Sequence, residues 1–557
     1  MAGTWQPLTN QPPFQACTML LLTDGSVFVN GYQSTQNWKL VPDSDGSYVN
    51  GTWVRLADML TTRLYYASAV LADGRVFVAG GEYSTSGGDT KDVEIYDPVW
   101  NTWKTINAPP GWNNIGDAPC CMLADGRVLL GSIFTTETSI FDPATDTFSA
   151  GPNKADTSSE ETWTLLPDGT VLVAECNNHP QAEKYVPSSN TWVSAGTVPA
   201  DLVQASSIEI GPALVLPDGT AFCVGATGTT DIYTPPANPS QPGTWTQGPT
   251  FPADGTGQPR EAKDTPGVLL PNGRVLVTVG PGVDGFNLGA TFYEYDPIAK
   301  SLTQVPTPTN AGGNPYNMRM LLLPTGQVLA SASSGDIEVY TPDGDPEEDW
   351  RPLITSVPSH LRNKQTYQLM GRRLNGLSQA CSYGDDATMA SNYPIVKIRS
   401  DVDGKEYYCR TFDHSTMGIA TGNAIVSTHF KVPFNVPHGK ADLVVIANGI
   451  ASEPVDVRIR PWRLHFPFDE AMYNNLIGSL ADGPLWVLGP HGPIPVDPQG
   501  PFGKDAKAAW AQLMKDTQTL VALGEKAAKR QAAEKSPVHK HIKKQATLRE
   551  AAGAKRV

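Results

Sequence analysis

A turn glycine that recurs between residues 25 and 326 constrains the fold of this chain more than any other feature. Each glycine separates two short runs of β-branched, small or aromatic residues, as in the stretch 61–103. Runs bounded by Gly, Asp, Asn or Pro are typical of β-strands joined by tight turns. The glycines follow one another at intervals of roughly 50 residues, at Gly25, Gly74, Gly126, Gly169, Gly219, Gly273 and Gly326. The spacing predicts seven copies of one β unit.

Each unit reads as four strands. The third strand ends in a Tyr-Asp-Pro type of turn, as at Tyr96-Asp97-Pro98, and the fourth carries an aromatic residue such as Trp53 or Trp103. The sixth unit has Leu302 there instead. One sheet of this size cannot bury both of its faces, so each unit needs neighbours on either side. A period of about 50 residues is that of kelch-type propeller blades, and we expect a seven-bladed ring.

The seventh unit lacks a fourth strand of its own, because the chain runs from Pro342 into an acidic turn. The N-terminal Thr4-Trp5 repeats the fourth-strand pattern of Thr52-Trp53. We therefore predict that the N-terminal strand completes the last blade. A ring closed in this way leaves no free sheet edge.

The remaining chain predicts three further segments. Residues 350–460 contain short strands at a spacing that suits an immunoglobulin-like sandwich. Residues 461–503 are rich in Pro and Gly and read as an extended strap, and residues 504–557 predict an amphipathic helix with a basic tail. The predicted fold is therefore all-β, with a seven-bladed propeller at 1–349, a sandwich and a C-terminal helical tail.

Charge is unevenly distributed along the chain. The net charge is −15, but residues 504–557 contain 13 Lys and Arg against 5 Asp and Glu. The body should therefore repel nucleic acid, while the tail could attract an acidic surface or mediate self-assembly. An apolar run long enough to span a membrane is absent from the sequence, and so is a basic and apolar leader at its start. We expect a cytoplasmic protein, or an extracellular one if a leader has been removed.

The cysteines number seven and form no C-x-x-C pair. Most of them fall inside predicted strands, where a free cysteine behaves as a small buried apolar residue. Cys381 and Cys409 share one predicted domain and are the pair that could form a disulfide.

A kelch ring followed by an immunoglobulin-like domain resembles the galactose oxidase and glyoxal oxidase family of copper-radical oxidases. In that family an Arg-x-Tyr at the start of the second blade bears the radical tyrosine, and Arg63-Leu64-Tyr65 matches it. Tyr83, after Gly80-Gly81, corresponds to the family's stacking tryptophan. Tyr316 corresponds to the axial tyrosine, and Asn317 stands where the family has a histidine ligand.

The resemblance also implies a second histidine and a cysteine that is crosslinked to the radical tyrosine. His414 in the predicted sandwich corresponds to the histidine, so copper would be held by Tyr65, Tyr316 and His414. The cysteine position falls on Ala16, and Cys17, one residue further on, should point to the opposite face. Copper(II) binding depends on imidazole, and His179 is the single histidine in residues 1–349.

The starts of the innermost strands form the second candidate site. Nine residues before the turn glycines lie Tyr65, Asp117, Glu160, Asp264 and Asn317, among others, with Tyr316 and Trp163 at the same level. Together with Tyr83, these side chains predict an acidic, aromatic-edged channel mouth that favours a cation, an amine or sugar hydroxyls. Carboxylates alone suit calcium better than copper. The alternative is that the acids pair with Arg63, Arg260 or Lys263.

Three functions remain open at this point. The first is a non-catalytic propeller that binds a small ligand or a partner protein at the channel mouth. The second is a copper-radical oxidase of alcohols or aldehydes that produces hydrogen peroxide. The third is a structural subunit of a larger assembly.

Overall fold

The computed structural model describes residues 3–460, apart from residues 86, 283–284 and 384–389, and the paired backbones of β40 (Trp486–Gly489) and β41 (Gly492–Pro495). The chain divides into two units, Met1–Trp462 and Arg463–Val557. Except for β40 and β41, the predicted strap at 461–503 and the predicted helical tail at 504–557 lie outside the described residues. Within the described part, no helix has the length and apolarity that a bilayer crossing requires.

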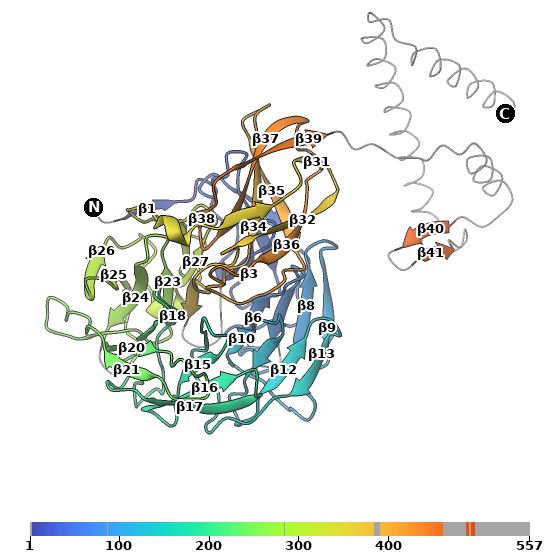
Figure 1. Cartoon of the computed structure of the whole chain (residues 1–557). Helices are drawn as coiled ribbons and strands as arrows, with labels where there is room; N and C mark the ends of the chain where they lie inside the picture. Colours follow the sequence, from blue (N-terminus) through green and yellow to red (C-terminus); the bar gives the residue numbers. More distant parts are fainter. Residues whose placement is uncertain are drawn as a thin grey trace, which may run out of the picture. The chain divides into compact units, whose positions relative to one another are not determined.

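Seven four-stranded antiparallel blades form the propeller, as predicted (Figure 1). Blades 1 to 3 consist of β2 (Ala16–Leu21), β3 (Val27–Gly31), β4 (Asn37–Val41) and β5 (Thr52–Arg55); β6 (Ala67–Val70), β7 (Val76–Ala79), β8 (Val93–Asp97) and β9 (Thr102–Ile106); and β10 (Cys120–Met122), β11 (Val128–Leu130), β12 (Ser139–Asp142) and β13 (Thr147–Ala150).

Blades 4 to 6 continue in the same order. They consist of β14 (Thr164–Leu165), β15 (Val171–Ala174), β16 (Gln181–Val186) and β17 (Thr191–Thr197); β18 (Ala213–Val215), β19 (Ala221–Val224), β20 (Thr230–Thr234) and β21 (Thr244–Gln247); and β23 (Pro266–Leu269), β24 (Val275–Pro281), β25 (Thr291–Asp296) and β26 (Ser301–Val305). The short strand β22 (Arg260–Glu261) pairs with β24.

The recurring glycines make the turns between the first and second strands. Gly74 has a φ of 87° and its N–H donates to the Leu71 carbonyl, while the Asp73 side chain accepts from the N–H of Arg75. This backbone conformation favours glycine because a β-carbon would be strained there. The repeated turn therefore sets the direction of the second strand in every blade.

Outer-strand tryptophans join neighbouring blades. The Trp103 indole lies 5.2 Å from the Tyr96 ring of its own blade and donates to the Ala57 carbonyl ahead of it. Trp53 donates in the same way to Asn10, and Trp245 to Ala195. The aromatic positions seen in the sequence thus pack within one blade and tie it to the preceding segment.

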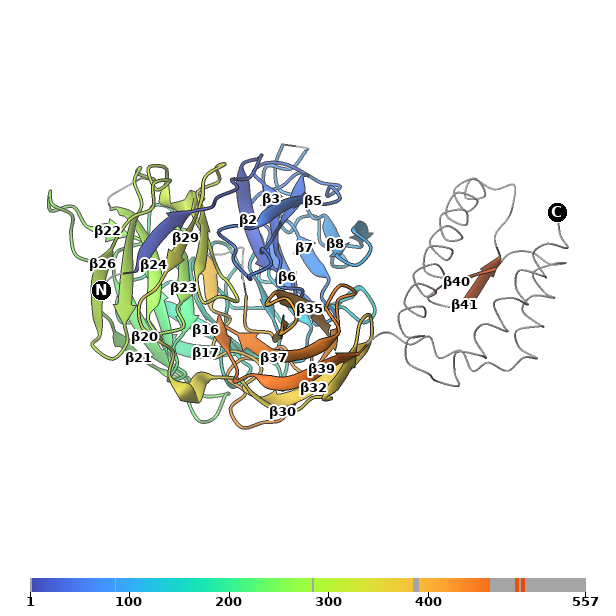
Figure 2. The same cartoon turned by 90° about the horizontal axis from the view of Figure 1, so that it is seen from above.

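The N-terminal strand completes the seventh blade. β1 (Thr4–Pro7) pairs with β29 (Ile337–Thr341), outside β28 (Val328–Ser331) and β27 (Arg319–Leu322). Figure 2 shows β1, in dark blue, beside β29. The Trp5 indole donates to the Pro306 carbonyl of blade 6 at 2.7 Å. Trp5 therefore links the last two blades of the ring.

A nine-stranded curled sheet follows the propeller, after the short 3₁₀ helix η2 (Glu348–Trp350). It encloses its own core around Leu369, Ile398 and Phe430, which agrees with the predicted immunoglobulin-like fold. Its strands are β30 (Leu353–Ser356), β31 (His360–Arg362), β32 (Thr366–Arg372), β34 (Ile395–Ser400), β35 (Glu406–Phe412), β36 (Val426–Lys431), β37 (Gly439–Ala447), β38 (Ile450–Ala451) and β39 (Val455–Arg460).

This second sheet packs on the hairpin turns of the propeller. The N–H of Thr411 donates to Thr23, and the N–H of Met417 donates to Ala124. One strand of the same region, β33 (Cys381–Tyr383), pairs instead with the innermost strand β23 of blade 6. Residues that follow the propeller in sequence therefore return to its inner surface.

All seven cysteines are free and buried. The sequence left open a disulfide between Cys381 and Cys409, and that possibility is wrong. Cys381 lies on β33 and accepts from the Leu322 amide, while Cys409 belongs to the core of the second sheet.

Candidate functional site

The innermost strands of the blades all begin at one face of the ring, which we call the channel mouth. Their turns with the second strands lie at the other face, on which the second sheet packs. Tyr65, Glu160 and Asp264 each precede an innermost strand and have positive φ values of 47°, 58° and 45°. Because non-glycine residues seldom adopt this conformation, its recurrence marks the channel mouth as a place where backbone strain is maintained.

Aromatic side chains occupy one side of the channel mouth. The Tyr65 ring meets the Tyr83 ring edge-on at 6.2 Å, and the Tyr316 ring meets that of Phe286 at 5.3 Å. Tyr316 lies on the 3₁₀ helix η1 (Pro315–Asn317), and its hydroxyl accepts from the Asn314 amide at 3.1 Å. The two predicted phenols Tyr65 and Tyr316 interact electrostatically, so the structure brings them together.

An arginine and a third tyrosine complete this aromatic side. The Arg319 guanidinium lies 3.6 Å from the Tyr383 ring centre and 5.5 Å from that of Tyr65. Both Arg319 and the Tyr383 hydroxyl donate to the Tyr316 carbonyl, at 2.7 and 2.6 Å. Sequence reasoning did not place Arg319 here. The pairing of β33 with β23 brings Tyr383 to Arg319.

Cys17 also lies at the channel mouth, which corrects the prediction that it points away. It interacts electrostatically with Tyr65 and Tyr32, and the Ser333 hydroxyl donates to its sulfur at 3.7 Å. The pairing of β2 with β3 shifts register between Ala16 and Met19. A bulge of this kind breaks the strict alternation of faces on which the prediction depended.

Three carboxyl groups lie on the opposite side, and we call them the acidic trio. Glu160, Glu209 and Asp264 come from the starts of blades 4, 5 and 6, and one oxygen of each lies within 4.8 Å of the others. Glu209 lies ten residues before the turn glycine Gly219, one position further from it than Glu160 and Asp264 are from theirs. Asp117 of blade 3 is buried and interacts electrostatically with Tyr83, which connects the two sides of the mouth.

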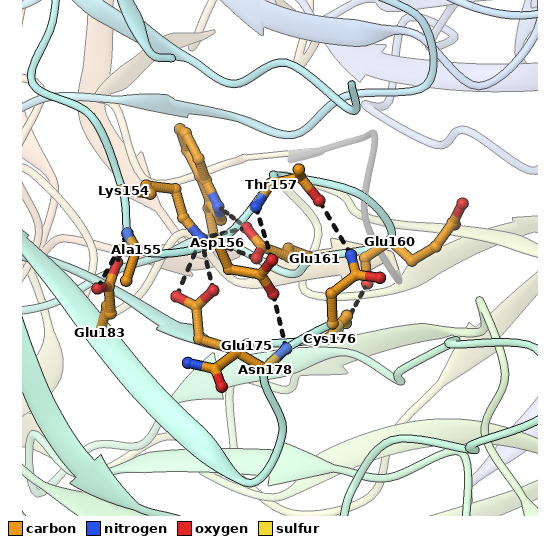
Figure 3. Close-up of polar contacts among 12 residues, drawn as sticks. Lys154, Ala155, Asp156, Thr157, Glu160, Glu161, Glu175, Cys176, Asn178 and Glu183 are labelled. Carbon is orange, nitrogen blue, oxygen red and sulfur yellow. Dashed lines mark hydrogen bonds and ion pairs between the residues drawn. The ribbon is translucent and has the colours of Figure 1, made fainter. Parts of the chain in front are cut away.

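Three neighbouring acids form ion pairs with lysines. Glu261 pairs with Lys263 at 3.0 Å, as the alternative interpretation of the acidic residues expected. Glu161 and Glu175 share Lys154, whose Nζ donates to both carboxylates at 2.7 to 3.0 Å (Figure 3). We call Lys154, Glu161 and Glu175 the buried triad, because all three side chains are inaccessible to solvent.

The buried triad lies directly behind Glu160. Trp163, predicted at the mouth, is buried here and donates to Glu161 at 3.0 Å, so it supports the triad instead of lining the channel. The Cys176 thiol, next to Glu175, donates to the Glu160 carbonyl at 2.8 Å. Burial raises the pKa of both Glu161 and Glu175 despite the nearby ammonium. The two carboxyl groups of the triad therefore retain one proton between them at neutral pH.

His414 lies away from the two phenols. Its Nδ1 is 2.9 Å from the Thr428 hydroxyl in the second sheet, and its ring stacks on Tyr393, whose hydroxyl donates to Leu21 at the turn end of blade 1. Burial lowers the pKa of His414 to about 3. The structure thus does not bring His414 together with Tyr65 and Tyr316.

These residues differ from the copper ligands that the resemblance implies. The Asn317 side chain has a buried oxygen without a hydrogen-bond partner among the described residues, but an amide oxygen is a weak ligand for copper. Burial raises the pKa of the Tyr65 phenol, and Arg319 offsets this only in part.

Comparisons with known proteins point to the same architecture. A kelch motif matches residues 63–110. Galactose oxidase from Gibberella zeae is 34% identical over 83 residues, which are 15% of this chain and 11% of that enzyme. N-acetylneuraminate epimerase from Yersinia enterocolitica is 28% identical over 184 residues, 32% of this chain and 44% of that protein. The chain therefore spans less than half the length of these curated relatives.

Two solved structures are similar to this chain at low sequence identity. A fungal alcohol oxidase of the AA5 family in complex with copper has 14% identity and a TM-score of 0.48, over 82% of this chain and 100% of that one. A catalytically inactive virginiamycin B lyase from Staphylococcus aureus with quinupristin has 10% identity and a TM-score of 0.42, over 61% of this chain and 99% of that one.

Proposed function

The chain is a kelch propeller with local sequence similarity to galactose oxidase, and we propose that it is a non-catalytic binding protein. Its ligand is a small molecule or a segment of a partner protein that enters the channel mouth. The acidic trio holds a cationic group of this ligand. The phenols of Tyr65 and Tyr316 contact the body of the ligand.

The convergence of the acidic trio carries this proposal. Three carboxyl groups from three consecutive blades lie within 4.8 Å of one another. Convergent carboxyl oxygens create a negative potential that attracts a cation. An ammonium group offers three donors to such a set of acceptors, and calcium prefers oxygen ligands of the same kind.

The aromatic side supports binding without chemistry. Tyr65 is a protonated phenol, and the Arg319 guanidinium lies 5.5 Å from its ring centre. Residue 317 is an asparagine and has no imidazole, and the imidazole of His414 contacts Thr428 in the second sheet. A neutral phenol is a good surface for an apolar body and a good hydrogen-bond partner for a hydroxyl.

Calorimetric titration of the full chain tests the proposal. The probes are calcium chloride and 1,5-diaminopentane, and the test variant is Glu160→Gln with Asp264→Asn. We expect at least one probe to bind and the double variant to weaken that binding at least ten-fold. Glu347→Gln removes an exposed carboxylate that follows β29, away from the channel mouth, and should bind like the parent chain. Binding of neither probe, or equal binding to the double variant, would contradict the proposal.

A second candidate function, oxidation of alcohols or aldehydes with release of hydrogen peroxide, is favoured by the position of Cys17. The resemblance implies a cysteine next to the radical tyrosine, and Cys17 lies beside Tyr65. Protein produced with added copper separates the two candidates. Stoichiometric bound copper together with peroxide formation from a simple alcohol or aldehyde would replace the binding function with an oxidase.

A further inference from the structure

Exposed apolar side chains surround the channel mouth. They lie in the loops that lead into the innermost strands or that join the second and third strands, and these loops share the face on which the innermost strands begin. The exposed fractions are 54% for Tyr83, 54% for Phe134, 37% for Ile208, 46% for Phe286 and 68% for Leu288. We call these five residues the apolar rim.

Four of the five rim residues adjoin a residue of the mouth. Tyr83 meets Tyr65, Phe286 meets Tyr316, and Ile208 precedes Glu209 in the chain. The Phe134 ring lies near Gly116, directly before Asp117. The rim and the acids are therefore parts of one surface, with charge towards the channel and apolar groups around it.

We propose that this surface binds a polypeptide segment in which a lysine or arginine is flanked by apolar residues. The cationic side chain enters the mouth towards the acidic trio, and the flanking residues pack on the apolar rim. This inference rests on the proposed function and specifies its ligand.

Charge and size favour a peptide over a small amine. A small amine reaches the acids but leaves a surrounding rim of five apolar side chains in water. Exposed apolar patches bordered by polar groups mark interaction sites, because their burial is favourable by about 25 cal/mol per Å². An extended segment covers both the mouth and the rim, and a basic residue complements the acids.

Selection from a phage library of random 12-residue peptides on the full chain tests the inference. We expect enriched peptides to carry Lys or Arg between apolar residues. A fluorescein-labelled synthetic copy should bind in anisotropy titrations, and replacing its basic residue with Gln should weaken binding at least ten-fold. Failure of the library to enrich peptides, or enrichment of peptides that lack a basic residue, would overturn the proposal.

Matched surface variants locate the binding. Phe134→Ser with Phe286→Ser should weaken peptide binding at least ten-fold. Trp100→Ser with Ile298→Ser is the control, since these residues are 70% and 94% exposed in turns between third and fourth strands, at the other face. Both variants change exposed positions, so their thermal midpoints should match that of the parent chain. Equal loss in both variants, or in neither, would contradict the assignment to the rim.

The outcome also separates this inference from the proposed function. If 1,5-diaminopentane binds and its affinity depends on the acidic trio while no peptide is enriched, the mouth is a small-ligand site and the inference fails alone. If neither amine, calcium nor peptide binds, both fail.

Discussion

At the scale of single residues, one proton decides the charge of the buried triad. Lys154 carries one positive charge, while Glu161 and Glu175 would carry two negative charges if both were ionised. An uncompensated charge in a dry interior is costly, so the triad retains a proton instead. Burial, followed by repulsion from Glu161, raises the pKa of Glu175 to about 10.

Glu175→Gln should therefore flatten the dependence of stability on pH. A carboxyl group whose pKa is higher in the folded than in the unfolded state contributes its full stabilisation of the fold below the unfolded pKa. This contribution is lost as the pH rises through the folded pKa, which is about 10 for Glu175. The glutamine imitates the protonated form, so we expect the variant to have a higher thermal midpoint than the parent chain at pH 9. The difference should shrink towards pH 5. An unchanged slope in scans from pH 5 to 9, with Glu137→Gln as control, would show that the triad does not hold the proton.

Asp231 offers a second test at this scale. It is buried on β20, and its carboxylate accepts from the Ala200 amide at 3.2 Å. Burial raises its pKa to about 7. Stability contributed by this proton is lost as pH rises through about 7, so Asp231→Asn should raise the thermal midpoint at pH 8 and have little effect at pH 4. A loss of stability at both pH values would indicate that the ionised carboxylate is needed.

At the scale of elements, carboxylates near the start of several third strands fasten the loop that enters the same blade. Glu94 on β8 accepts from the amides of Leu60 and Thr61, and Glu338 on β29 accepts from the amide of Asn310. Asp231 on β20 holds the Ala200 amide in the same way. Since the loop leads directly to an innermost strand, these bonds help to position the channel mouth.

Glu94→Gln should destabilise the chain strongly. Glu94 also pairs with Arg63 at 2.5 Å, and both side chains are almost fully buried. Removing one partner leaves a buried guanidinium without its counter-charge, which costs about 3 to 5 kcal/mol. Asp58→Asn disrupts the exposed pair with Arg55 and should cost less than about 1 kcal/mol. Urea denaturation compares the two, and similar midpoints would mean that the loop amides and Arg63 are satisfied without Glu94.

At the scale of the whole molecule, the chain closes its ring with its first strand. β1 has four residues, and Trp5 contacts Phe292 of blade 6 and Tyr340 of blade 7. Without it, the edge of β29 would be exposed, and free edges promote association.

Deletion of residues 1–7 should therefore lower the thermal midpoint and cause concentration-dependent aggregation. A synthetic peptide of residues 1–10, added in excess, should restore both properties because it can pair with β29. Light scattering and thermal scans measure the effect, and Trp5→Ala should give a smaller loss. A deletion variant that stays monodisperse and equally stable would mean that closure contributes little.

The sequence by itself determined the blades and the ring. The turn glycines, the outer tryptophans and the copy of the fourth-strand pattern at Thr4-Trp5 are local signals, because a tight turn or an alternating strand depends on neighbouring residues. The candidate acids Glu160 and Asp264 and the phenol Tyr65 could be placed at one face because each lies nine residues before a turn glycine. Tyr316 lies ten residues before Gly326, next to Asn317.

Only the tertiary structure decided which of these side chains meet. A bulge turned Cys17 towards Tyr65, and packing buried Trp163 against Glu161. Pairing of β33 with β23 brought Tyr383 to Arg319 from a region that follows the propeller in sequence. The sharing of Lys154 by Glu161 and Glu175, and the convergence of Glu209 on two other acids, depend on contacts between loops distant in sequence. A local pattern does not encode such contacts, since they form when the blades assemble.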